Sequence, residues 1–347
     1  MRILVTIAHY CGPPSAGRKL LYGSQAAQLP RAAALGTQLT TLHRNFGHRR
    51  FAGAMPELAP ALADGRRLDI VIATVTGRNV LAEAGIGWNS FEVVYYDGDP
   101  MLLGFECQRI ARERLGHYDV YAMLEDDLIL HDPDFFEKSV WFVHEFGPTR
   151  VLQPHRVEVS KSGPVLGKVF VDPPVLGPSK PQLQGLGSAR LEAEYAGRHQ
   201  GFDRASNPHS GCWIVTDEQL RYWVKQPEFY DRDSSWIGSL ESAATRALAL
   251  SFDVFKPAAP DPSFLELEHY CLHYANHGWK PDGALFGLDP LLLLAQRAGA
   301  GSTADSVAAQ QQTGEMSAEN SRMSRILKSR RKTFGHLLGT FLRKPLG

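Results

Sequence analysis

The chain has 347 residues, and its 37 Lys and Arg residues balance 37 Asp and Glu residues. A chain without net charge creates no general field for polyanions, so nucleic acid is not expected as a partner. Its four cysteines form no CxxC pair, which argues against a zinc ribbon or disulfide scaffold and favours a reducing, cytoplasmic compartment. No run of about 18 apolar residues occurs, so no transmembrane helix is expected.

Apolar strands and amphipathic helices alternate through the first 150 residues. The pattern predicts strands at 2–9, 68–75 and 91–96, and helices at 25–46 and 102–115. A further apolar segment, YAMLEDDLIL at 121–130, precedes a helix that reaches residue 146, for which Asp132 is the predicted cap. This order predicts an α/β fold with a mostly parallel central sheet flanked by helices.

The second half of the chain is less regular. A strand is predicted at 150–159, and extended loops are expected across the Pro- and Gly-rich residues 160–208. A short strand at 212–215 is followed by a helix at 216–225, which the capping-box sequence TDEQ opens. A helix at 236–250 and a strand at 252–257 follow. From 264 to 279, aromatic residues alternate with acids and histidines.

The end of the chain changes in composition. Residues 297–321 have the small, polar composition of a flexible linker. Residues 322–347 contain eight Lys and Arg residues, no acid and an apolar helical face. A basic amphipathic helix of this kind fits a peripheral anchor on an anionic membrane surface, such as the inner face of a membrane. Docking on the protein itself or on a partner is an equal interpretation.

Three consecutive acids, Glu125, Asp126 and Asp127, close the YAMLEDDLIL segment. Neighbouring carboxylates repel one another unless a cation or hydrogen-bond donors neutralise them. Ligands of open α/β sheets bind at the carboxyl ends of the strands, where these acids are predicted to lie. The position favours a divalent-metal site for a phosphorylated ligand over a solvated acidic turn.

The order of these segments resembles that of GT-A-type glycosyltransferases. In that family an acidic DxD motif at the end of a central strand holds a divalent cation against the donor diphosphate, and Glu125-Asp126-Asp127 stands there as an EDD variant. The family often places an Arg about four turns upstream, where Arg109 lies. Downstream, NPHSGCWIVT resembles the segment lining the donor-sugar and acceptor pocket. GSLESAAT resembles the helix start that presents an acid to the acceptor, and FLELEH resembles the segment that supplies a metal-binding His.

The resemblance covers residues 2–277 and implies a function. It implies a hexosyl- or hexosaminyl-type transferase that uses Mn²⁺ or Mg²⁺ and moves a sugar from a nucleoside-diphosphate sugar to a glycan or lipid-linked acceptor. It also implies one catalytic domain at 1–296, with a nucleotide-binding half at about 1–150 and an acceptor half at about 151–296.

On the donor side, Asp127 is expected to contact the metal. Asp126 or Glu125 is expected on the donor ribose or acting through water, and Glu125 is also a candidate metal ligand. A structural role for Asp127, capping the next turn, is the alternative. The end of the first strand (Ala8, His9 and Tyr10) is expected to face the nucleobase, with Tyr10 either stacking on it or closing the core. Arg78 is a candidate for base or phosphate contact, with plain surface as its alternative, and Arg109 is a candidate for the diphosphate.

On the acceptor side, Glu241 is the candidate general base, and a favourable interaction with the helix dipole is its alternative. His269, His273 and His277 are spaced by four residues and would share a helical face. If the segment is extended instead, His269 alone would reach the metal. His209 is a candidate for hydrogen bonding the sugar, or for ordering its loop.

Two other functions fit parts of the sequence. A nucleotidyltransferase acting on sugar phosphates would carry a Gly-rich loop after the first strand, which CGPPSAGRK matches loosely. A non-catalytic, membrane-tethered glycan-binding protein is the second alternative, against which the acid triplet and Glu241 argue. A GT-B architecture fits less well, because no second long βαβ array follows residue 150.

Overall fold

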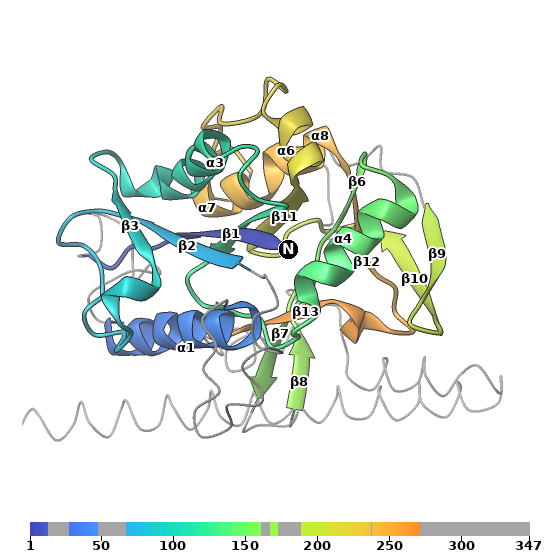
Figure 1. Cartoon of the computed structure of the whole chain (residues 1–347), viewed down its shortest axis with the longest axis horizontal. Coiled ribbons are helices and arrows are strands. Elements are labelled where there is room, and N and C mark those ends of the chain that lie inside the picture. Colours follow the sequence, from blue (N-terminus) through green and yellow to red (C-terminus); the bar gives the residue numbers. More distant parts are fainter. Residues whose placement is uncertain (13–27, 48–66, 161–166, 173–188, 237, 271–347) are drawn as a thin grey trace, which may run out of the picture. The chain divides into compact units, whose positions relative to one another are not determined.

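The computed structural model describes residues 1–12, 28–47, 67–160, 167–172, 189–236 and 238–270 (Figure 1). All of them belong to one compact unit, Met1–Lys280. The predicted linker at 297–321, the basic helix at 322–347, His273 and His277 lie outside the described residues, as does most of the CGPPSAGRK loop. No helix within the described ranges is long and apolar enough to cross a membrane.

A five-stranded sheet forms the centre of the unit, with the strand order β11–β4–β1–β2–β3 (Figure 1). Four strands are parallel, and β11 runs antiparallel to β4. The strands are β1 (Arg2–Ala8), β2 (Arg67–Thr74), β3 (Glu92–Tyr95), β4 (Val120–Glu125) and β11 (Cys212–Thr216). The predicted α/β class with a mostly parallel sheet is confirmed. Because the chain winds from β1 to β3 and then returns to β4 beside β1, a topological switch point lies at the carboxyl ends of β1 and β4.

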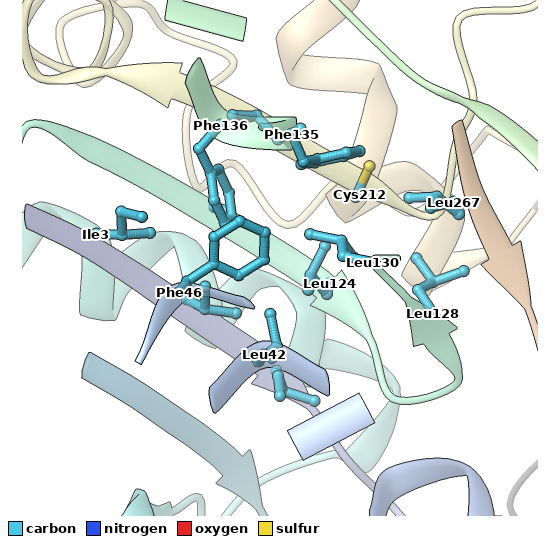
Figure 2. Packing of buried hydrophobic residues seen from close by; sticks show 14 of the residues in the cluster. Ile3, Leu42, Phe46, Leu124, Leu128, Leu130, Phe135, Phe136, Cys212 and Leu267 are labelled. Carbon is cyan, nitrogen blue, oxygen red and sulfur yellow. The ribbon is translucent and has the colours of Figure 1, made fainter. Parts of the chain in front are cut away.

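One face of the sheet packs on helices α1 (Gln28–Phe46) and α4 (Phe135–Phe146). Figure 2 shows this core from close by, with Ile3 of β1 near Phe46 and Phe136. The rings of Phe46 and Phe136 meet edge to face, with 4.8 Å between their centroids. Each fully buried aliphatic or aromatic side chain of this kind contributes about 1.5–3 kcal/mol to the free energy of unfolding.

The other face packs on helices α3 (Leu103–Glu113), α6 (Asp217–Trp223) and α8 (Ala247–Ser251). Leu4 and Ala8 of β1 point into this second core, since alternate residues of a strand face opposite sides. Strands covered on both faces are apolar throughout, which is why β1, β2 and β4 were predictable from continuous hydrophobic runs.

Two four-stranded sheets complete the described fold. The first has the order β6–β12–β10–β9, from β6 (Arg150–Leu152), β9 (Arg190–Tyr195), β10 (Arg198–Arg204) and β12 (Asp253–Pro257). The second has the order β5–β13–β7–β8, from β5 (Leu128–Ile129), β7 (His155–Ser160), β8 (Gly167–Phe170) and β13 (Glu266–His269). In this second sheet His269 pairs with Leu128, directly after the acidic triplet.

The region 150–208 differs from its prediction. The single strand predicted at 150–159 is two strands, β6 and β7, in different sheets, because Pro154 between them has no N–H for a ladder. Residues 160–208, predicted as loops, contain β8 and the β9–β10 hairpin. Ala196 and Gly197 turn this hairpin with φ of 49° and 76°, as a two-residue hairpin loop requires. The alternating sequence of β9, RLEAEY, was the available signal.

Two helices also differ in detail. The helix predicted at 236–250 begins at α7 (Ser239–Glu241) and passes through a π-helical turn, η5 (Ser242–Arg246), into α8. Helix α4 begins at Phe135, so Asp132 caps the preceding turn instead, accepting the Asp134 N–H at 2.9 Å. The described residues also include the short 3₁₀ turns η3 (Trp88–Ser90), η4 (Pro100–Leu102) and η6 (Pro262–Phe264).

The predicted capping box at the start of α6 is confirmed. The Thr216 hydroxyl accepts the Gln219 N–H at 3.2 Å, and the Gln219 side chain accepts the Thr216 N–H at 3.0 Å. Gln219 also donates to the carbonyls of Pro148 and Arg150, which ties the helix start to β6.

Thr216→Ala should therefore lower the free energy of unfolding by about 1 kcal/mol, the usual cost of losing an N-cap side chain. Urea unfolding followed by circular dichroism measures this change. Thr37→Ala is the matched control, because its hydroxyl only bonds back to the Ala33 carbonyl within α1 and should be dispensable. Equal unfolding free energies for the two variants would contradict the capping role.

Candidate functional site

The acidic triplet lies at the topological switch point. Glu125 is the last residue of β4 and pairs in register with Ala8, the last residue of β1. All three carboxylates are buried, yet each has different neighbours.

Asp126 is held from two sides. Its Oδ2 lies 2.5 Å from His9 Nδ1, and Arg31 donates to its Oδ1 at 2.9 Å. The Val80 N–H donates to His9 Nε2 at 3.1 Å, so the ring proton is on Nδ1 and is donated to Asp126. Burial raises the pKa of Asp126, but the Arg31 charge and the His9 hydrogen bond outweigh it and hold the pKa below its ordinary value.

This pairing gives His9 and Asp126 a structural role, while their predicted contacts with the donor nucleotide remain predictions. His9 is completely buried, with both ring nitrogens hydrogen bonded. Both oxygens of Asp126 are likewise engaged inside the protein. Both side chains are therefore held by contacts inside the protein.

Asp127 is the opposite case. Its side chain is 2% exposed, and neither carboxylate oxygen has a hydrogen-bond partner among the described residues. His269 faces it, with Nε2 3.4 Å from Oδ2. Leaving a buried polar group without hydrogen bonds costs about 1–3 kcal/mol, and more for a charged group. Such a carboxylate is suited to receive a ligand.

His269 is oriented by a second carboxylate. Its Nδ1 lies 2.7 Å from Glu158 Oε1, which leaves Nε2 facing Asp127. Burial lowers the pKa of His269, but Asp127 and Glu158 outweigh it, and the pKa is raised. His269 lies in a strand rather than a helix, so the extended interpretation of this segment is confirmed up to residue 269.

Glu125 has a third environment. Its Oε2 lies 3.7 Å from Arg156 Nη1, and it packs against Gly211. Gly211 has a φ of 66°, and a Cβ at this position would lie 2.8 Å from Oε2, so only glycine fits. Burial raises the pKa of Glu125 to about 7, with Arg156 lowering it and Glu241 raising it further.

A buried basic cluster lies behind Glu125. Arg156 donates two hydrogen bonds to Asp172 Oδ1, at 2.9 and 2.6 Å, and Lys256 Nζ lies 3.4 Å from Asp172 Oδ2. Burial raises the pKa of Asp172, but Arg156 and Lys256 outweigh it, and the pKa is held well below its ordinary value.

The same cluster holds His209. Lys256 donates to the His209 carbonyl at 2.6 Å, and His209 Nδ1 lies 2.9 Å from the Thr245 hydroxyl in the π-helical turn. Burial first, and then the charge of Arg156, hold the pKa of His209 well below its ordinary value, so its ring is neutral at pH 7. His209 is buried, so its position favours the loop-ordering alternative over direct contact with a sugar.

The remaining predicted residues lie around this centre. Glu241 is partly exposed in α7, and its charge acts on Glu125. Tyr10 and the exposed Arg78 both lie against Gly12, so they share one surface beyond the end of β1. The Arg109 guanidinium pairs with Glu106 and Glu113 of its own helix, both at 2.6 Å, and not with the acidic triplet.

The charged residues that sequence reasoning missed all depend on contacts distant in the chain. They are Arg31, Arg156, Glu158, Asp172 and Lys256. One signal was available. Arg156 and Glu158 are charged residues two positions apart that alternate with Val157 and Val159, which places both on one face of β7.

Asp172→Asn should lower the free energy of unfolding by about 3–5 kcal/mol at pH 7, because it leaves two buried cations without their counter-charge. The stabilisation by Asp172 is complete above the ordinary pKa of an aspartate, about 3.9, and is lost as the pH falls from there toward the lower native value. The difference in the free energy of unfolding between wild type and Asp172→Asn should therefore decrease below about pH 4.

Denaturant unfolding between pH 3 and pH 8 measures this difference. Asp253→Asn is the control, since Asp253 pairs with Arg204 and its side chain is 44% exposed. Its loss should cost less than about 1 kcal/mol. A similar small cost for Asp172→Asn would show that the basic cluster does not need this carboxylate.

No protein-family model matches the sequence, and no curated protein matches it. A solved structure that matches is mannose-1-phosphate geranyltransferase from the bacterium Thermus thermophilus. That match has 10% sequence identity and a TM-score of 0.29, and it covers 73% of this chain and 72% of that chain. Similarity at this level assigns neither a family nor a reaction, so the function has to be inferred from the site.

Proposed function

We propose that the protein is a metal-dependent glycosyltransferase that moves a sugar from a nucleoside-diphosphate sugar to a glycan or lipid-linked acceptor. One observation carries the proposal. At the switch point of a largely parallel sheet, the buried Asp127 carboxylate has no hydrogen-bond partner among the described residues and faces the imidazole of His269. The resemblance of the EDD segment to the acidic motif of GT-A enzymes supports the same assignment.

The residues present fit a divalent cation. Asp127 offers two oxygens without hydrogen bonds, and His269 offers a ring nitrogen that Glu158 orients, an arrangement common behind metal-bound histidines. Across the described residues, no three His, Cys, Asp or Glu side chains form a ready ligand group. Two protein ligands leave coordination positions for phosphate oxygens and water, as Mg²⁺ or Mn²⁺ sites in phosphate-handling enzymes do.

The local charge also favours a cation. Five buried carboxylates (Glu125, Asp126, Asp127, Glu158 and Asp172) face three basic side chains (Arg31, Arg156 and Lys256) and His269. Arg31 is committed to Asp126, while Arg156 and Lys256 are committed chiefly to Asp172. Asp127 therefore has His269 as its basic neighbour and no hydrogen bond among the described residues.

A bound Mn²⁺ or Mg²⁺ would act as a Lewis acid that neutralises the departing diphosphate. Asp127 and His269 would hold it, with Glu158 fixing the imidazole. Glu241, the partly exposed carboxylate beside Glu125, would accept the proton of the acceptor hydroxyl. Tyr10 and Arg78 would meet the nucleotide at the end of β1.

Asp127→Asn should weaken Mn²⁺ binding by more than about 100-fold, beyond the range typical of outer-shell residues. Metal-free stability should change little, because the substitution gives up the 3.4 Å interaction with His269 but also removes a buried charge that lacks hydrogen bonds. Titration calorimetry with Mn²⁺ alone and thermal unfolding measure the two effects. Asp134→Asn, at an exposed position before α4, is the matched control.

A panel of nucleoside-diphosphate sugars tests the reaction itself, through thermal stabilisation and Mn²⁺-dependent hydrolysis. If wild type and Asp127→Asn bind Mn²⁺ equally and neither responds to any donor, the proposal is wrong. Release of pyrophosphate from a nucleoside triphosphate and a sugar phosphate would instead identify a nucleotidyltransferase.

Glu241→Gln should lower the rate of donor hydrolysis by about 10²–10⁴-fold, the usual contribution of a general base, while Mn²⁺ affinity stays at the wild-type value. The pairing of these two measurements separates proton transfer from metal binding. Glu218→Gln, an exposed acid in the first turn of α6, is the control. Hydrolysis within threefold of wild type would assign the base to another residue.

A further inference from the structure

We propose that His9 is a positioning residue for Asp127, acting through Asp126. Asp126 anchors the acidic turn inside the protein. The anchored turn then presents Asp127 as the metal ligand. The inference rests on the proposed function, because it assigns a purpose to a residue behind the proposed metal site.

The first support is that the two neighbouring aspartates contact different parts of the fold. Asp126 bonds to His9 at the end of β1 and to Arg31 in the first turn of α1. Asp127 faces His269 of β13, the strand that pairs with both β5 and β7. A shift of the turn that brought Asp127 toward new donors would pull Asp126 away from two charge-assisted bonds.

The second support is the backbone of the turn itself. Gln38 of α1 donates from one amide nitrogen to the carbonyls of Glu125 and Leu128, at 2.7 and 2.9 Å. The Glu125 N–H donates to the Gly211 carbonyl at 3.0 Å, and the Tyr270 N–H donates to the Asp127 carbonyl at 2.9 Å. Among the described residues, the Asp126 side chain adds to these main-chain bonds an anchor that ties the turn to both β1 and α1.

The third support is the way His9 itself is fixed. Its backbone N–H bonds to the Ala73 carbonyl at 2.9 Å, and its Nε2 accepts the Val80 N–H. The ring therefore has one orientation and one tautomer, with the Nδ1 proton directed at Asp126. A rigid donor of this kind holds the carboxylate in one geometry, which the neighbouring metal ligand needs, because ligand sites tolerate displacements of only about 0.5 Å.

Two substitutions of His9 test this role. Asparagine can place an amide N–H close to the position of Nδ1, whereas leucine, of similar size, has no donor. Both remove the acceptor for the buried Val80 N–H, so that loss of stability is common to the pair. The difference in Mn²⁺ affinity between the two variants therefore reports the hydrogen bond to Asp126.

We expect His9→Leu to weaken Mn²⁺ binding about 10–100-fold, and His9→Asn to stay within about threefold of wild type. Calorimetric titration with Mn²⁺ alone is carried out below the unfolding temperature of each variant, with unfolding measured in parallel. Arg31→Met removes the other bond to Asp126 from the helix start. It should shift Mn²⁺ affinity in the same direction, and it provides the test if His9→Leu does not fold.

The outcomes separate this inference from the proposed function. Failure of wild type to bind Mn²⁺ would overturn both. A second outcome is that wild type binds Mn²⁺, Asp127→Asn does not, and both His9→Leu and Arg31→Met bind as tightly as wild type. The positioning role of His9 is then wrong, while the proposed metal site stands. Equal loss in His9→Leu and His9→Asn would also overturn it, because the bond to Asp126 would then be irrelevant.

Discussion

The structure depends on how three adjacent carboxylates are accommodated away from water. Asp126 is neutralised by Arg31 and a histidine proton, and Glu125 is held beside Arg156 with a pKa raised to about 7. Asp127 is left without a hydrogen bond in the described part of the chain. Because the cost of burying an ion is large, a fold that retains this arrangement has to recover the cost elsewhere, and the proposed cation would be a direct means.

The elements around the triplet share this task. Helix α1 contributes Arg31 and Gln38, β7 contributes Arg156 and Glu158, and β13 contributes His269. The β5–β13–β7–β8 sheet therefore also positions residues around the acidic triplet. By pairing β13 beside the short strand that follows the triplet, it brings an imidazole to a carboxylate more than one hundred positions earlier in the chain.

Sequence reasoning predicted the central sheet because β1, β2 and β4 are covered on both faces and read as continuous apolar runs. It placed the acid triplet at the sheet edge for the same reason. It singled out Asp127 as the metal ligand, but it could not predict that His9 and Arg31 hold Asp126 or that His269 faces Asp127, since these residues converge only through tertiary pairing. The β9–β10 hairpin was missed because the Pro and Gly content of its surroundings outweighed the period-two pattern of RLEAEY.

The pairing of β13 with β5 also has a consequence for biosynthesis. The parallel strands β1 to β4 and their helices leave the ribosome well before Glu266–His269, and domains generally fold from the N-terminus as they are made. A nascent chain can thus complete its main sheet while the acidic turn still lacks the imidazole opposite Asp127. Pairing of the last strand then completes the contact between Asp127 and His269, and under the proposed function a product truncated before β13 would lack one of the two metal ligands.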